Sequence, residues 1–240
     1  DARTDRDPMW IGDAICFASD RDGTLNLYRY DLASKAVTAI TRSTRGDVRW
    51  PSTDHRSRIV YELDGELHVL DVFSHQGAWG LYALKAGATS ATFVDSSEPA
   101  LELARQSAKA NGFADRVDAR AGDAFDVLKA LADANERWDV VVVDPPAFAR
   151  SKKDIPQAKA AYERINKLAL RVLAPDGYLA TSTCSYHVGG EEFLGCVARA
   201  LFASGRAARL LEMRGQAIDH APLFAMPEGA YLKCAILHVS

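Results

Sequence analysis

Hydrophobic and polar residues follow two different patterns along the chain, and the pattern changes near residue 66. Before that point, short alternating or β-branched runs are separated by turn residues, as in 14–18, 25–30 and 36–41. Such runs indicate β-strands, and Asp22-Gly23 between the first two can supply the positive φ of a tight hairpin turn. Residues 1–66 are therefore expected to form a small all-β segment.

The all-β segment also repeats itself with a period of about 40 residues. Asp7-Pro-Met-Trp10 recurs as Asp47-Val-Arg-Trp50, and Ile15-Cys-Phe17 recurs as Ile59-Val-Tyr61. Several short strands in a unit of this length indicate the blades of a β-propeller. The run 19–32 resembles blades of the tricorn-protease and TolB-type propellers. Fewer than two blades fit here, and their open edges leave strand pairing into a homodimer as one expectation.

From residue 67 onward, apolar strands alternate with segments of helical periodicity, which is typical of a parallel sheet with crossover helices. Seven strands are expected, at 67–72, 91–95, 117–120, 138–143, 178–183, 208–213 and 231–238. One clear helix begins at Ser97 and stops at Asn111-Gly112, and another spans 156–173. Residues 67–240 are thus predicted to form a Rossmann-like α/β domain, with a mostly parallel seven-stranded sheet and helices on both faces.

Composition places the chain among ordinary globular proteins. Hydrophobic residues make up 48% and charged residues 25% of its 240 residues, which argues against disordered, collagen-like and coiled-coil classes. No apolar run approaches the ~20 residues of a membrane helix, and the N-terminus lacks the apolar stretch of a signal peptide, so a cytoplasmic protein without a membrane partner is expected. Acidic and basic residues balance over 72–240, so a nucleic acid would have to be bound by a local patch or by a separate domain.

Several candidate residues lie where the predicted strands end. Asp71 closes the first strand and precedes a turn up to Gly77, where the backbone can approach a ligand closely, although a packing turn is the alternative. Asp95 ends the second strand and Asp123 follows the third, where carboxylates can bind the ribose and the adenine amine of a nucleoside. Each could instead cap the following helix. Three acidic strand ends together favour a nucleoside cofactor.

The fourth and fifth strands bring a carboxylate and a thiol to the same edge. Asp144 follows a run of valines, and two prolines stiffen the loop behind it. Cys184 follows the fifth strand, at the edge where open α/β sheets bind ligands, so we interpret it as a nucleophile rather than a small buried hydrophobe. The other cysteines are expected to be buried: Cys16, Cys196 and Cys234. Without Cys-x-x-Cys pairs, neither a disulfide framework nor a metal site is indicated.

With these positions in place, residues 67–240 resemble a class I S-adenosylmethionine-dependent methyltransferase, in particular the catalytic domain of the large-subunit ribosomal RNA cytosine-C5 methyltransferases. The motifs that carry the resemblance lie at 71–77, 94–97, 108–112, 144–154, 184–187 and 214–220, within about 70% of the chain. Members of that family carry an RNA-binding PUA-type domain and a connecting β-rich domain ahead of the first strand. The propeller-like segment stands in their place here, as in a fusion.

The resemblance implies S-adenosyl-L-methionine as cofactor, RNA as substrate and methyl transfer to carbon 5 of cytosine. Cys184 would add to carbon 6 of the base, and Asp144 would hydrogen-bond the base. His187 ranks below water or Asp144 as the base that removes the proton from carbon 5. The cofactor contacts implied are Phe73, Ser74, Gly77, Asp95, Ser96, Asp123, Ala124 and Asp144. The substrate contacts implied are Pro145, Pro146, Phe148, Ser185 and His187.

Two other interpretations stay open. The segment 144–148 could serve methylation of an exocyclic amine, which needs no thiol and would leave Cys184 structural. Alternatively, the chain could be a non-catalytic interaction module in which the propeller-like segment binds a partner. For Phe148, stacking on the target base and anchoring of the loop are equally compatible with the sequence.

Overall fold

The structure is a computed structural model that describes residues 4–43, 46–57, 59–64, 66–217, 220–223, 225–226 and 229–240, with the backbone alone at 49, 50 and 60–64. Positions 218 and 219 of the motif at 214–220 lie outside the described residues. The chain divides into two compact units, Asp1–Glu66 and Leu67–Ser240. This boundary lies where the sequence pattern changes.

The first unit is built from antiparallel strands. Strands β1 (Asp5–Ile11), β2 (Ala14–Ser19), β3 (Asn26–Asp31) and β4 (Val37–Ala39) form a four-stranded sheet in sequence order, and β5 (Asp47–Thr53) pairs with β6 (Ile59–Asp64). The repeated sequence phrases occupy matching strands, β1 with β5 and β2 with β6. A shared core is formed by Met9, Cys16, Ala18, Leu25, Leu27 and Val48. The small all-β segment expected from the sequence is therefore observed.

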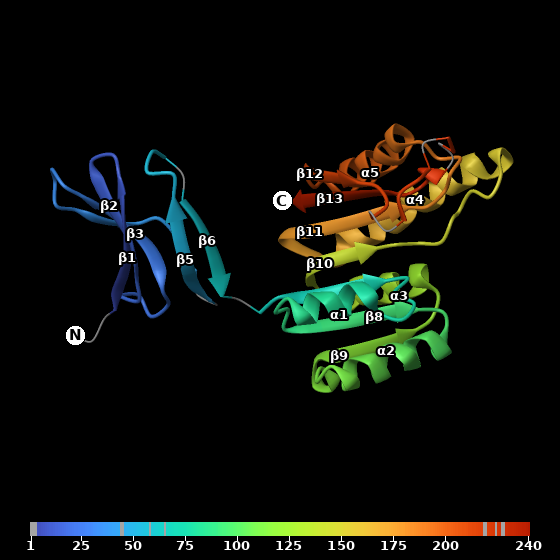
Figure 1. Cartoon of the computed structure of the whole chain (residues 1–240), viewed down its shortest axis with the longest axis horizontal. Helices are drawn as coiled ribbons and strands as arrows, with labels where there is room; N and C mark the ends of the chain where they lie inside the picture. The colour runs from blue at the N-terminus through green and yellow to red at the C-terminus, as the bar shows by residue number, and fades with distance from the viewer. Residues whose placement is uncertain are drawn as a thin grey trace. The chain divides into compact units, whose positions relative to one another are not determined.

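The second unit contains a seven-stranded sheet. Its strands are β7 (His68–Val72), β8 (Ser90–Asp95), β9 (Val117–Ala121), β10 (Trp138–Val143), β11 (Leu173–Thr183), β12 (Ala208–Arg214) and β13 (Lys233–Val239). They lie in the order β12-β13-β11-β10-β7-β8-β9, as Figure 1 shows, and β13 runs antiparallel to both of its neighbours while the remaining pairs are parallel. The predicted Rossmann-like, mostly parallel sheet is confirmed.

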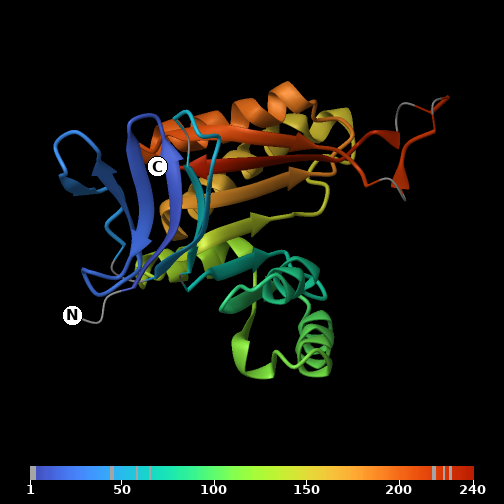
Figure 2. The same ribbon diagram turned by 60° about the vertical axis from the view of Figure 1, so that its left-hand side comes forward.

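Helices cover both faces of this sheet (Figures 1 and 2). Helices α1 (Ala78–Lys85) and α2 (Glu98–Ala110) pack on one face with Phe93, and α3 (Ala124–Asp133), α4 (Ile155–Val172) and α5 (Gly190–Ser204) pack on the other with Val94. The adjacent residues Phe93 and Val94 of β8 thus pack against the helices on opposite faces of the sheet, because successive side chains of a strand point to opposite faces. Two short 3₁₀ helices, η1 (Ala114–Arg116) and η2 (Lys152–Asp154), lie in connections. Within the described part of the chain, no helix combines the length and apolar character needed to cross a membrane.

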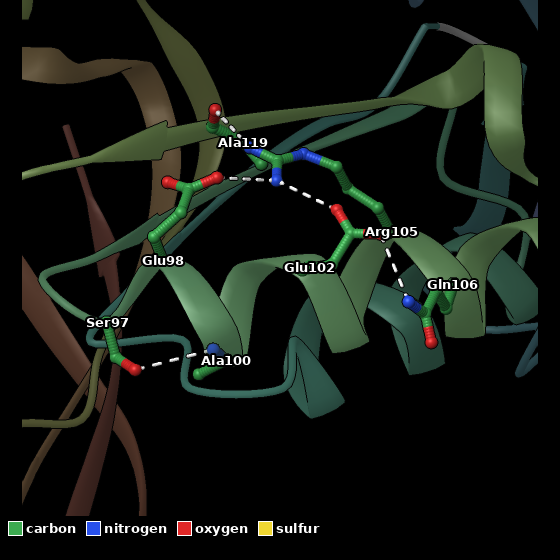
Figure 3. A network of polar contacts seen from close by, with 7 residues as sticks. All are labelled: Ser97, Glu98, Ala100, Glu102, Arg105, Gln106 and Ala119. Carbon is green, nitrogen blue, oxygen red and sulfur yellow. Dashed lines mark hydrogen bonds and ion pairs between the residues drawn. The ribbon is translucent and has the colours of Figure 1, made fainter.

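Helix α2 is held by a network of polar contacts (Figure 3). Ser97 caps the helix by accepting a hydrogen bond from a backbone N–H of the first turn at 3.3 Å. Arg105 pairs with Glu98 at 2.8 Å and Glu102 at 3.3 Å, and it also donates to the carbonyl of Ala119 in β9. Exposed pairs of this kind each contribute little free energy. Together they tie α2 to β9 and hold the turn that joins β8 to α2.

Candidate active site

The direction in which strands are added reverses at β7. The chain adds β8 and β9 on one side of β7, and then β10 and β11 on the other side. In open α/β sheets, ligands bind outside the carboxyl ends of the strands at such a point. Asp71 lies in β7, and Asp144 directly follows β10, with its N–H donating to the carbonyl of Val72 at 3.2 Å. The structure therefore brings these two sequence-predicted carboxylates to the switch point of the sheet.

The loop between β7 and α1 has an unusual backbone. Phe73, His75 and Gly77 have φ values of +62°, +48° and +76°. Non-glycine residues rarely adopt this region, and when they do they cluster at ligand sites. A Cβ on Gly77 would lie 3.0 Å from the ring of Phe93 and 3.1 Å from the Cβ of Ala104, so glycine is required there by both φ and space.

Two buried polar atoms beside this loop have no hydrogen-bond partner. They are Oδ1 of Asp71 and Oγ of Ser74. The other Asp71 oxygen accepts a hydrogen bond from the N–H of Gly80 at 3.0 Å. Burial raises the pKa of Asp71 to about 7, the Gly80 hydrogen bond opposes this rise, and the charges of Asp144 and Asp95 add to it. Because buried polar atoms usually have hydrogen-bond partners, these two unpaired atoms fit a site that binds a polar ligand.

The carboxylates of Asp95 and Asp123 have different local roles. Asp95 accepts hydrogen bonds from the N–H groups of His75 at 2.8 Å and Ser97 at 2.9 Å, and so links the β7–α1 loop to the start of α2. Asp123 is the N-cap of α3 and accepts from two backbone N–H groups through the same oxygen. The capping alternative is therefore observed for Asp123, whereas Ser97 rather than Asp95 caps α2. Of their neighbours, Ser96 is exposed and Ala124 is buried.

Asp144 is held from both sides. Its Oδ1 accepts a hydrogen bond from the hydroxyl of Ser182 at 2.7 Å, and its Oδ2 accepts one from the indole N–H of Trp79 at 3.1 Å. Trp79 lies on α1 with 46% of its surface exposed. Sequence reasoning missed both donors. For Ser182 a signal existed, because it lies at the end of β11, two positions before Cys184.

Cys184 lies half-buried at the end of β11, with its Sγ 3.7 Å from the carbonyl oxygen of Pro145. Burial raises the pKa of the Cys184 thiol, the charge of Asp144 raises it further, and Lys233 opposes both. The ammonium of Lys233 donates to the carbonyls of Ser185 at 3.1 Å and Val188 at 2.7 Å. The resting group is thus a thiol at neutral pH, held in a loop that Lys233 fastens. The other three cysteines are buried.

A buried hydroxyl network joins the loop after β10 to the loop after β11. The Tyr162 hydroxyl accepts from Thr183 Oγ1 at 2.7 Å and lies 2.8 Å from Ser185 Oγ. Ser185 Oγ also accepts from the N–H of Ala149 at 3.2 Å. All four residues are buried. The predicted substrate residue Ser185 therefore lies beneath the surface, where its hydroxyl connects the two loops.

The aromatic ring of Phe148 packs inside the second unit. Its centroid lies 4.8 Å from that of Tyr162, 6.2 Å from Phe73 and 6.3 Å from Phe125. This arrangement matches the loop-anchor alternative, and stacking on a base stays a prediction. The remaining predicted substrate residues differ in access: Pro145 is buried, Pro146 is exposed and His187 is half-buried, with its ring 5.3 Å from that of Tyr186.

Two family models match parts of the chain. A family model described as "Conserved hypothetical protein 95" matches residues 54–184, and one described as "Tricorn protease N-terminal beta propeller domain" matches residues 1–76. "Ribosomal RNA large subunit methyltransferase I" of Aeromonas salmonicida is 43% identical over 166 residues, covering 69% of this chain and 42% of that protein. The same-named protein of Vibrio cholerae is 42% identical over 179 residues, covering 72% and 45%. The chain thus spans about half the length of the curated relatives it matches.

Solved structures show the fold. The structure titled "A putative sam-dependent methyltransferase from Streptococcus mutans" superposes with a TM-score of 0.63 at 18% identity, over 85% of this chain and 58% of that one. TrmN from Thermus thermophilus superposes with a TM-score of 0.50 at 24% identity, over 72% and 43%. At these sequence identities the similarity supports the fold of the second unit only, and its chemistry has to be argued from the residues of the site.

Proposed function

Because the chain belongs to the family described as Conserved hypothetical protein 95, we propose that its second unit is an S-adenosylmethionine-dependent methyltransferase that acts on ribosomal RNA, with carbon 5 of cytosine as the methyl acceptor. The observation that carries the proposal is the pairing of Asp144 and Cys184 at the ends of the adjacent parallel strands β10 and β11. Relatives named Ribosomal RNA large subunit methyltransferase I support the RNA substrate. Such a substrate implies a cytoplasmic protein.

The residues at the ends of β7 to β9 fit a nucleoside cofactor. S-adenosylmethionine, when bound, supplies an electrophilic methyl group. The β7–α1 loop at 73–77 offers a close backbone approach, and the unpartnered atoms of Asp71 and Ser74 lie beside it. Asp95 would accept hydrogen bonds from the ribose through its remaining lone pairs, and the Asp123 oxygen that does not cap α3 would accept one from the adenine amine.

Cys184 and Asp144 would carry the chemistry on the base. Carbon 5 of cytosine is a poor nucleophile, so Sγ of Cys184 would add to carbon 6 while the thiol proton passes to the ring nitrogen beside Asp144, which makes carbon 5 electron-rich. Carbon 5 would then take the methyl group, with S-adenosylhomocysteine as the leaving group, and water would remove the proton from carbon 5. The bond between Sγ and carbon 6 would break to release the thiolate, which would take back the proton from the ring. Asp144, held by Ser182 and Trp79, hydrogen-bonds the ring and stabilises its protonated form. Groups in such roles are worth about 10²–10⁴ in rate.

Two substitutions test the mechanism. We expect Cys184→Ala to abolish methyl transfer to an RNA that contains cytosine, while calorimetric titration shows unchanged binding of S-adenosylhomocysteine. Cys196→Ala, which removes a buried thiol from α5, is the matched control and should retain transfer. Unchanged transfer by Cys184→Ala would refute the covalent step and favour an exocyclic amine as acceptor.

The cofactor site has its own test. We expect Asp95→Ala to weaken binding of S-adenosylhomocysteine, because the turn that joins the β7–α1 loop to α2 loses its hydrogen bonds along with a ribose acceptor. No binding by the unmodified chain would refute the methyltransferase proposal and favour a non-catalytic module.

A further inference from the structure

Charged side chains are divided along the carboxyl edge of the sheet. Asp95 and Asp123 lie on the side of β8 and β9, and Asp144 lies at the switch point. Beyond β10 the sign changes, because three cations lie within four residues of one another: Arg150, Lys152 and Lys153. A polyanion that reaches this edge is repelled by the first half and attracted to the second.

The three cations are free to bind a ligand. All are exposed, and none of their side chains forms an ion pair or hydrogen bond with another residue that the structure describes. Two cations of nearby helices differ, since Lys159 pairs with Glu192 at 2.9 Å and Arg199 pairs with Glu163 at 2.7 Å. The one carboxylate inside the segment, Asp154, is engaged by the N–H groups of Arg150 and Ser151 and by the Ser151 hydroxyl.

The segment 150–154, called the cationic segment here, begins beside the loop that holds Cys184. Residue 149, which precedes it, is hydrogen-bonded to Ser185, the residue after Cys184. The next residue, Tyr186, has 57% of its surface exposed although it carries a large aromatic ring. Exposed aromatic rings beside unpaired cations are typical of surfaces that bind single-stranded nucleic acid, because bases stack on the ring while cations contact phosphates.

We propose that Arg150, Lys152, Lys153 and Tyr186 form the substrate surface of the second unit and bind a single-stranded RNA segment next to the target nucleotide. The cations contact its phosphates, and Tyr186 stacks on a flanking base. This rests on the proposed function. A single strand fits better than a duplex, because a nucleotide must leave its stack before carbon 6 can meet the half-buried thiol of Cys184. With acidic and basic residues balanced over 72–240, this local surface supplies the attraction that the net charge does not.

The test measures how salt affects RNA binding. Anisotropy of a labelled single-stranded RNA oligonucleotide is followed with the full chain and saturating S-adenosylhomocysteine at several salt concentrations. Each lost phosphate contact flattens the slope of log K against log salt by ~0.7, so the triple variant R150A/K152A/K153A should flatten it by about 2 and bind about 100-fold more weakly at 0.1 M salt. The triple variant K85A/K109A/K129A, which removes three other exposed lysines, should bind like the unmodified chain.

Tyr186 is tested in the same assay. We expect Tyr186→Ala to weaken binding about tenfold with an unchanged salt slope, and Tyr186→Phe to retain affinity, because stacking requires the ring and not the hydroxyl. An unchanged slope in R150A/K152A/K153A, equal losses in both triple variants, or tighter binding of a duplex of the same sequence would each overturn the proposal.

Titration with S-adenosylhomocysteine separates this proposal from the proposed function. The variant R150A/K152A/K153A should bind it as the unmodified chain does, because the cations lie outside the cofactor half of the edge. A chain that binds S-adenosylhomocysteine and methylates RNA, yet keeps its salt slope in R150A/K152A/K153A, retains the proposed function and refutes this surface. A chain that fails to bind S-adenosylhomocysteine refutes the proposed function itself.

Discussion

The buried carboxyl group of Asp71 should make the stability of the second unit depend on pH. Burial raises its pKa from 3.8 to about 7 in the folded chain. In the unfolded chain the group ionises near its ordinary value, so between these two pH values the folded state holds a proton that the unfolded state has released. Stability then falls as the pH rises through this range. It is highest below pH 4, and above pH 7 the loss is complete.

The size of the effect follows from the same pKa values. A difference of about three pH units corresponds to about 4 kcal/mol of unfolding free energy. In Asp71→Asn the amide oxygen can still accept the Gly80 N–H, but the group cannot ionise. We therefore expect the stability of Asp71→Asn relative to the unmodified chain to rise by about 3 kcal/mol between pH 4.5 and pH 8, because about 1 kcal/mol of the total is already lost at pH 4.5.

Urea unfolding followed by circular dichroism at 222 nm measures this difference. All helices in the described part of the chain lie in the second unit, so the signal reports on the unit that contains Asp71. Asp115→Asn, at an exposed carboxylate, is the matched control and should leave the pH dependence unchanged. If Asp71→Asn and the unmodified chain lose stability in parallel as the pH rises, Asp71 is ionised in the folded protein and the reasoning from burial is wrong.

Three further predictions concern packing and the thiol. Tyr162→Phe removes a buried hydroxyl that two others contact, so it should lower the unfolding free energy in urea by about 1–3 kcal/mol, and an unchanged value would contradict a role for the network. Gly80→Ala places a Cβ 2.4 Å from the buried Phe93 ring and should lower the unfolding free energy by about 1–3 kcal/mol. Gly195→Ala in α5 has room for the Cβ and should raise the unfolding free energy by ~0.5–1 kcal/mol. A change of the same sign in both variants would contradict the packing. The rate at which iodoacetamide alkylates Cys184, followed by mass spectrometry, should rise with pH and reach its midpoint above pH 9, because burial and Asp144 raise the thiol pKa. Lys233 lowers this pKa, so Lys233→Met should move the midpoint to a higher pH. A midpoint below that of a free thiol would contradict this prediction.

Much of the fold could be predicted because its elements carry strong local patterns. The strands of the second unit are apolar runs between helical segments, and α2 has a Ser cap, an early Pro and a Gly stop. Strand β1 was not predicted as a strand, because Pro8 and several exposed charged residues interrupt its alternation and Met9 alone is buried. Strand β11 begins at Leu173, five residues earlier than predicted, and so includes Pro175 and Asp176.

The sequence predicted individual residues of the site, but not the contacts between them. Strand ends identified Asp95, Asp144 and Cys184, but not the groups that hold them. Lys233 is brought to Cys184 by pairing of β11 with β13, in which Thr183 lies opposite Lys233. That register joins residues about 50 positions apart, and no local pattern of charge or hydrophobicity encodes it.

The position of β13 has a consequence for the order in which the molecule is made. This strand lies between β11 and β12, although it is synthesised after both. While residues 233–239 are still inside the ribosome, β11 and β12 have no strand between them, and the carbonyls of Ser185 and Val188 lack the ammonium that fastens them. A nascent chain can therefore assemble β7 to β11 and expose the loop of Cys184 before that loop is fixed. The environment of the thiol is therefore complete only after β13 has been synthesised and inserted between β11 and β12.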